Sequence, residues 1–254
     1  MNKDLVRQIA VIIALVLMVV VNGLAGSTEL IGGQDTAAVS NKIPALFTPA
    51  GYVFSIWGVI YLGLIVYAVY QALPAQRENP RLRSTGYIFV LSCAANIIWL
   101  FLWQFEILWA SIIVMAALLA TLIAIYVRLG TGRTAAPQAE RLAVRLPFSI
   151  YLGWISVATI ANAAAVLYRA GWTSGGEVWT VVMLGAAVII AALMSYYRAD
   201  VAYQAVLVWA FIGIALNTLP QFTGATLVKT AAWIAAGLVA VLAVGGLLLR
   251  RRRA

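Results

Sequence analysis

The sequence predicts an all-α membrane protein with eight transmembrane helices, because of its composition and the spacing of its charged residues. Of its 254 residues, 64% are hydrophobic and 10% are charged, and the mean hydropathy is +0.98. A water-soluble domain of this length cannot bury so much apolar surface. A helix of about 20 apolar residues crosses the core of a bilayer, and such stretches are expected at residues 9–25, 51–73, 86–105, 108–129, 146–168, 178–197, 201–219 and 227–249.

The first stretch, residues 9–25, has two interpretations. Lys3 and Arg7 precede it, and the tripeptide Gly-Leu-Ala at 23–25 resembles a signal-peptide cleavage site. The apolar run is longer than the apolar region of most signal peptides, so we expect a retained helix. The topology of the later spans is the same in both cases.

The distribution of Lys and Arg predicts the orientation. When the spans alternate from a cytoplasmic N-terminus, all of the 17 Lys and Arg residues except Lys42, Arg169 and Lys229 lie on the cytoplasmic side. Basic residues concentrate in cytoplasmic loops, whereas acidic residues contribute little to orientation. We therefore expect a multi-pass protein of the inner, or plasma, membrane with both termini in the cytoplasm. The net charge of +9 then reflects this bias and does not predict nucleic-acid binding.

The composition excludes several kinds of chemistry. The chain has no histidine and a single cysteine, Cys93. This excludes an intrachain disulfide, a histidine-based triad and a His-rich or multi-Cys metal site. No charged residue falls deep within an expected span, whereas ion and proton-coupled transporters usually need an intramembrane acid or base. We expect no catalytic residue, no metal site and no required cofactor.

Residues 47–70 carry an unusual pattern, in which a proline turn leads into a charge-free run rich in aromatic residues. Trp57 and Tyr61 lie four residues apart and therefore share one helical face. Lipid does not require aromatic rings at mid-depth. This face predicts either helix packing, which is the commoner case, or a bound flat ligand.

Side-chain amides and further tryptophans recur at a similar depth. Asn96, Trp99 and Trp103 share one face of the third span, and Trp154 and Asn162 share one face of the fifth. At a rise of about 1.5 Å per residue, these groups and the aromatic face of the second span reach one level of the outer leaflet. They either line one pocket there or serve as packing contacts and an aromatic belt.

Three motifs together resemble the TspO/MBR family, the tryptophan-rich sensory proteins related to the translocator protein. The first motif opens the second helix of that family, and the residues that fall in register with it are Phe47, Pro49, Val53, Phe54, Trp57, Ile60 and Tyr61. Phe47 replaces a tryptophan of the family, and Ala50 replaces a proline.

The other two motifs lie in the third and fifth spans. The family pattern N-x-x-W-x-x-x-F-F is matched at Asn96 and Trp99, with Trp103 and Gln104 in place of the phenylalanines. The family pattern P-Y-x-x-W-x-x-F-A-x-x-L-N is matched by Tyr151, Trp154, Ala158 and Asn162.

This resemblance implies a five-helix bundle over residues 1–170 with three additional helices at 171–254, as a long bacterial form of the family. It also implies a pocket for a porphyrin, a tetrapyrrole or a similar flat hydrophobic ligand, covered by the first loop. The expected ligand-binding residues are Phe47, Pro49, Phe54, Trp57, Tyr61, Asn96, Trp99, Trp103, Trp154, Ala158 and Asn162. Sterol binding is not carried over, because the family's sterol motif is not met at residues 166–169.

Three functions are compatible with these observations. The chain is either a TspO-like protein that senses or carries a flat ligand, a permease-like subunit with a path between its spans, or an enzyme acting on a bound porphyrin with light or oxygen. The lack of intramembrane charge weakens the permease hypothesis. We favour the first function, with the lipid bilayer and a small hydrophobic ligand as partners, no nucleic acid, and a homodimer left open.

Overall fold

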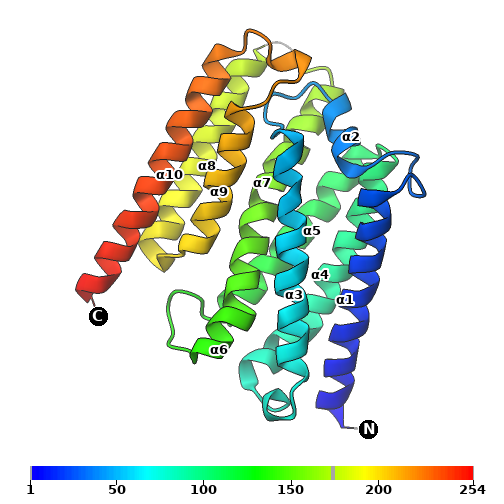
Figure 1. Ribbon diagram of the computed structural model, residues 1–254, viewed down its shortest axis with the longest axis vertical. Helices are drawn as coiled ribbons and strands as arrows, with labels where there is room; N and C mark the ends of the chain where they lie inside the picture. Colours follow the sequence, from blue (N-terminus) through cyan, green and yellow to red (C-terminus); the bar gives the residue numbers. More distant parts are fainter. Residues whose placement is uncertain (1, 173–174, 254) are drawn as a thin grey trace.

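The computed structural model describes residues 2–172 and 175–253, and this part of the chain is helical without a strand (Figure 1). Among these described residues, seven helices are long and apolar enough to cross a membrane. They are α1 (Lys3–Ser27), the 3-10 turn Gly51–Ser55 together with α3 (Ile56–Ala72), α4 (Pro80–Gln104), α5 (Leu108–Arg128), the continuous helical run 138–169 that ends in α7 (Leu146–Arg169), α8 (Gly176–Arg198) and α10 (Thr226–Arg253). The all-α membrane class is confirmed.

The expected count of eight spans is not confirmed, because the helix in the seventh stretch is short. This helix, α9 (Val201–Ala215), has 15 residues and is about 22 Å long, whereas the hydrocarbon core is about 30 Å thick. The helix ends early because the Asn217 side chain accepts a hydrogen bond from the Leu219 N–H at 2.9 Å. A 3-10 turn, Pro220–Phe222, then follows.

Three boundaries differ from the sequence prediction for local reasons. α4 begins six residues early, because Asn79 caps it by accepting from Arg81 N–H and Pro80 occupies its first position. The expected loop 26–46 contains a short helix, α2 (Thr36–Lys42), whose N-cap is Asp35. The expected loop 130–145 ends in α6 (Gln138–Glu140) and a π-helical turn, Arg141–Arg145, which continue into α7.

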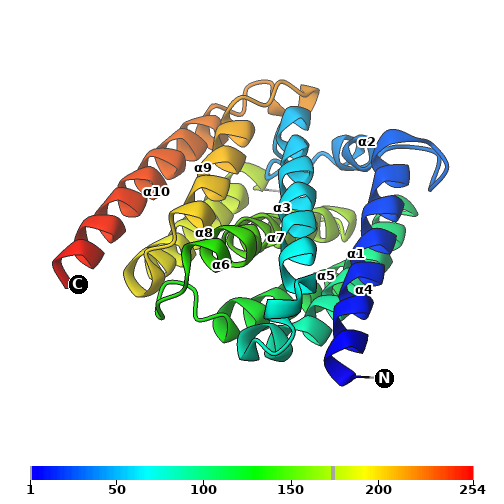
Figure 2. The ribbon, with the colours of Figure 1, turned by 60° about the horizontal axis from the view of Figure 1, so that its bottom comes forward.

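The helices form a five-helix bundle with a second layer beside it. In the bundle, α4 packs between α1 and α5, α5 packs on α7, and α3 contacts both α1 and α7. In the second layer, α9 packs on α7 and on α10, and α10 packs on α8. Figures 1 and 2 show this layer, in yellow to red, on the side of α7 away from α1.

The outer surface of the bundle is apolar, as expected for helices that face lipid. Large side chains such as Leu62 and Ile113 are 65% and 71% exposed. A water-soluble protein rarely exposes continuous apolar surface of this kind. The surface therefore agrees with the composition in placing these helices in a membrane.

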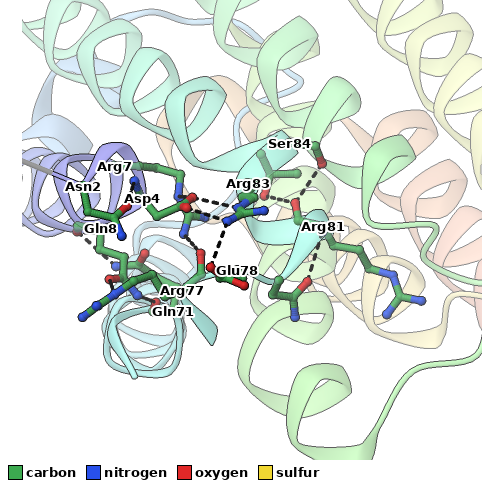
Figure 3. A network of polar contacts seen from close by, with 12 residues as sticks. Asn2, Asp4, Arg7, Gln8, Gln71, Arg77, Glu78, Arg81, Arg83 and Ser84 are labelled. Carbon is green, nitrogen blue, oxygen red and sulfur yellow. Dashed lines mark hydrogen bonds and ion pairs between the residues drawn. The ribbon is translucent and has the colours of Figure 1, made fainter. Parts of the chain in front are cut away.

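One end of the molecule, which we call the basic end, carries both described termini, the α3–α4 loop, the α5–α7 loop and the α8–α9 turn (Figure 1). Here α1 is attached to α4 and to the α3–α4 loop by the polar network shown in Figure 3. Asp4 accepts two hydrogen bonds from Arg83, at 2.8 and 2.6 Å, and Arg7 donates to the Arg77 carbonyl at 2.8 Å. The first helix is therefore built into the bundle at this end.

A buried carboxylate joins α4 to the start of α7 at the same end. Glu140 is 2% exposed and accepts from Arg81 Nη1 at 2.9 and 3.0 Å and from Arg145 Nη2 at 3.4 Å. A buried ion depends on its partners, because the charge has lost its hydration.

We expect Glu140→Gln to lower the free energy of unfolding by about 3 kcal/mol, because Arg145 would remain buried without its counter-charge. Thermal or denaturant unfolding in detergent measures this. The control is Glu78→Gln, which removes a carboxylate that is 81% exposed and 3.7 Å from Arg83. It should cost less than about 1 kcal/mol. Equal losses in the two variants would contradict the assignment.

Candidate ligand-binding site

An aromatic pocket lies between α3, α4, α7 and the segment that contains α2, at the end of the molecule opposite the basic end. Its free volume is about 40 Å³. The residues that line it are Thr36, Ser40, Ile43, Thr48, Pro49, Phe54, Trp57, Trp99, Trp103, Trp154, Val157, Ala158, Ala161, Asn162 and Ala165.

The pocket exists because α7 presents small side chains where the neighbouring helices present large ones. Ala158, Ala161 and Ala165 recur at helical spacing along one face of α7. Opposite them, Trp99 and Trp103 of α4 stack with ring centroids 5.8 Å apart and planes 23° apart. The space left between small and large side chains is the pocket.

Edge-to-face contacts build the second aromatic wall. The rings of Trp57 and Trp154 are 6.1 Å apart at 84°, and those of Phe54 and Trp154 are 5.8 Å apart at 82°. This geometry is favoured by the ring quadrupoles and holds each ring in place. Most of the lining is therefore aromatic or apolar, and no lining residue is titratable.

The structure brings most of the predicted site residues together. Those that line the pocket are Pro49, Phe54, Trp57, Trp99, Trp103, Trp154, Ala158 and Asn162. Three others lie outside the lining. Phe47 is fully buried, Tyr61 stacks on Trp57 at 5.6 Å, and Asn96 is buried and bonded to Asn22 and Tyr151.

The two predicted amides are engaged with other helices. Asn162 Oδ1 accepts from Trp99 Nε1 at 3.1 Å, and Asn162 Nδ2 donates to Ser111 Oγ at 2.9 Å. Asn162 thus joins α7 to α4 and α5. Its amide lines the pocket but already has partners within the protein.

Asn96 makes a second junction between helices. Its Oδ1 accepts from Asn22 Nδ2 at 2.7 Å, and its Nδ2 donates to the Tyr151 hydroxyl at 3.1 Å. All three side chains are buried. Asn96 therefore joins α4 to α1 and α7.

One fully buried polar atom of the pocket lining has no partner among the described residues. Trp154 is 3% exposed, and among the described residues nothing accepts a hydrogen bond from its indole N–H. A buried donor without a partner is costly and rare in proteins. It marks Trp154 as a place where a ligand acceptor would be favoured.

The sequence prediction missed several residues of the segment that covers the pocket, residues 36–53, which we call the covering segment. Thr36, Ser40, Ile43 and Thr48 line the pocket, and two of them lie on α2. The signal that could have found this helix is Asp35 at its N-cap, which accepts from the Ala38 N–H at 2.7 Å.

The α9 helix holds one end of the covering segment. Gly213 O accepts from the Ala50 N–H at 3.0 Å, and Asn217 Nδ2 donates to Thr48 O at 2.8 Å. A side chain at Gly213 would overlap with Val53. The short helix therefore positions the residues on either side of Pro49, although α9 itself does not line the pocket.

The α2 part of the segment is held less firmly. Trp103 Nε1 donates to Thr36 O, and Gln104 Nε2 donates to Thr36 Oγ1, both at 3.4 Å. Hydrogen bonds of this length are weaker than those of usual length. The two ends of the covering segment thus differ in how they are attached.

Comparison with known proteins agrees with this architecture. A family model described as TSPO-like protein matches residues 8–245. The chain belongs to the TSPO-like protein family. The match continues through α8, α9 and most of α10. The resemblance therefore extends beyond residues 1–170, the part of the chain that was expected to form the five-helix bundle. No curated protein and no solved structure matched the chain.

Metal binding requires suitable ligand side chains that lie close together. Within residues 2–172 and 175–253, no three His, Cys, Asp or Glu side chains gather where they could hold a metal ion.

We expect Gly213→Ala to lower the free energy of unfolding by about 1–3 kcal/mol, because the added methyl group overlaps with Val53 and displaces residues 48–53. Thermal unfolding in detergent measures it. Gly237→Ala is the matched control, since nothing lies within 4 Å of the added atom. It should be neutral or stabilise the helix by up to about 1 kcal/mol. A neutral Gly213→Ala would show that α9 does not constrain the segment.

Proposed function

We propose that this TSPO-like membrane protein binds a flat hydrophobic ligand, of porphyrin or tetrapyrrole type, in the aromatic pocket and uses it in a sensory or carrier role. The observation that carries the proposal is the meeting of Phe54, Trp57, Trp99, Trp103 and Trp154 around one pocket. Aromatic walls with few polar groups are typical of sites for flat hydrophobic molecules.

Ligand entry requires the pocket to open. Its volume of about 40 Å³ is far below the roughly 300–1,000 Å³ of typical ligand pockets. In this proposal α2 moves away, since it is held by the two 3.4 Å bonds to Thr36. Residues 48–53 stay in place on α9. The ligand then separates the tryptophans of α4 from those of α3 and α7.

The ligand is held by stacking and by one hydrogen bond. The ring faces of the tryptophans contact the macrocycle, and Trp154 Nε1 donates to an acceptor at its edge. The sequence contains no histidine, so His does not ligate an iron centre if the ligand carries one. No acid or base lines the pocket among the described residues, and the proposal assigns the pocket a binding role.

The proposed orientation places the basic end in the cytoplasm. Its support is the distribution of Lys and Arg, of which only Lys42, Arg169 and Lys229 belong to the opposite end. The aromatic pocket and α2 then lie toward the outer face of the inner membrane. A ligand would reach the pocket from that side.

Titration with protoporphyrin IX in detergent tests the proposal, with binding followed by the absorption of the porphyrin because the variants alter tryptophan fluorescence. Trp154→Phe keeps a ring but removes the donor, and should weaken binding about five- to tenfold, the effect of one lost hydrogen bond of about 1 kcal/mol. Ala158→Phe fills the pocket and should weaken binding by more than about tenfold.

The matched control is Trp233→Phe, on the exposed surface of α10, which should bind as the unchanged protein does. Equal affinity in all three variants would show that the porphyrin associates with the apolar surface or the micelle and would overturn the proposal.

A further inference from the structure

A second, larger cavity lies at the basic end, between the α5–α7 loop, the start of α7 and the α8–α9 turn. Its volume is about 480 Å³. We propose that it binds the phosphate-bearing headgroup of an anionic phospholipid, whose acyl chain lies in an adjoining apolar groove. Figures 1 and 2 both show the α5–α7 loop beside the turn that ends α8.

Three arginines line this cavity. Arg145 is 6% exposed and donates to Thr134 O at 2.6 Å, while its Nε has no partner among the described residues. Arg198 donates to Thr131 O at 3.2 Å and lies 5.5 Å from the Tyr126 ring centroid. Arg141 is exposed, and no described residue forms a hydrogen bond or ion pair with its side chain. The cavity therefore holds cationic groups with unused donors.

Asp200 also lines the cavity, and its single negative charge reduces but does not cancel the positive charge of the three arginines. Asp200 accepts from four neutral donors, which are the Tyr126 hydroxyl at 2.8 Å, the Ser149 hydroxyl at 2.6 Å and the N–H groups of Ala202 and Tyr203. Among the described residues it forms no ion pair.

Glu140 is shared between Arg81 and Arg145, so its single negative charge offsets only one of these two positive charges. Arginine donors suit phosphate oxygens because the planar guanidinium can give two parallel hydrogen bonds. The remaining positive charge favours a phosphate group over a neutral ligand.

The α5–α7 loop, which forms one wall of the basic cavity, is held in one position. Gly132 has φ +75°, and a side chain there would overlap with the Arg198 carbonyl. The close approach requires glycine and brings Thr131 within hydrogen-bond distance of Arg198. The arginine-lined cavity is therefore a defined feature of the fold.

An apolar groove continues from the cavity. Its presence favours a lipid over a free anion as the ligand. Leu146 and Ala202 line both. The groove has a volume of about 530 Å³ and runs between α3, α7 and α9 as far as Ser55 and Trp209. From Ala202 to Trp209 the helix rises about 10 Å. A cationic cavity joined to an apolar groove matches a headgroup joined to an acyl chain.

The test uses the full chain in detergent, with lipid adducts counted by native mass spectrometry. The probes are dioleoylphosphatidylglycerol and dioleoylphosphatidylcholine, with inorganic phosphate as a competitor. We expect tighter binding of the phosphatidylglycerol. Arg141→Gln and Arg198→Gln should each weaken it about fivefold, the effect of one basic residue near an anionic headgroup.

Two further variants separate the alternatives. Arg128→Gln removes one charge at the same end but outside the cavity, where Arg128 donates to Ser84 O, and should leave binding unchanged. Ala205→Phe fills the groove from an exposed position and should weaken phosphatidylglycerol binding without touching the arginines. Arg141→Gln is the decisive charge variant, because the side chain has no partner to lose.

Several results would overturn the proposal. Equal binding of the two lipids, or an equal loss in Arg128→Gln and Arg141→Gln, would show that the attraction is to the surface charge in general. Displacement of the phosphatidylglycerol by millimolar inorganic phosphate, together with an unaffected Ala205→Phe, would assign the cavity to a free anion.

Discussion

Hydrogen bonds between buried side chains of different helices are the interaction on which the rest of this structure depends. The hydrocarbon core of a membrane offers no water, so a buried amide must find its partners within the protein. Asn96 joins α4 to α1 and α7, and Asn162 joins α7 to α4 and α5. Such bonds form at only one relative depth and rotation of the helices. They therefore bring the tryptophans of α4 and α7 to one level.

The second layer gives the pocket a support that a five-helix bundle alone would lack. Helix α9 is too short to qualify as a span. The Gly213 carbonyl accepts from the Ala50 N–H, and the Asn217 side chain donates to the Thr48 carbonyl, so both bind the backbone of the covering segment. These bonds do not depend on the side chains of the covering segment. The family match, which continues to residue 245, is consistent with a common architecture for both layers.

The two cavities differ in lining and in size. The aromatic pocket is mostly apolar and has a volume of about 40 Å³. The basic cavity is lined by Arg141, Arg145 and Arg198 and has a volume of about 480 Å³. Both cavities lie along α7, which reaches from Leu146 at the basic end to Asn162 near the covering segment. A membrane molecule and a flat ligand could thus contact the same helix at opposite ends.

The sequence by itself determined the helical membrane class, the positions of seven spans and most of the aromatic lining. Apolar runs have a minimum length in a bilayer, and helical periodicity places Trp99 and Trp103, or Trp154 and Ala158, on one face. Helical periodicity shows which residues share one face of a helix, but it does not show which helix that face contacts. The contacts of Asn96 depend on the tertiary structure. Its side chain bonds to Asn22 and Tyr151 and does not line the pocket.

The same limit applies to the short elements. The apolar run 201–219 is continuous in sequence, yet α9 ends at Ala215, where Asn217 bonds to Leu219 and to Thr48. Helix α2 is too short to be stable alone and forms because it packs over the bundle. The arginine cavity joins residues separated by more than 50 positions. These features depend on contacts between distant parts of the chain, which local patterns of residues do not encode.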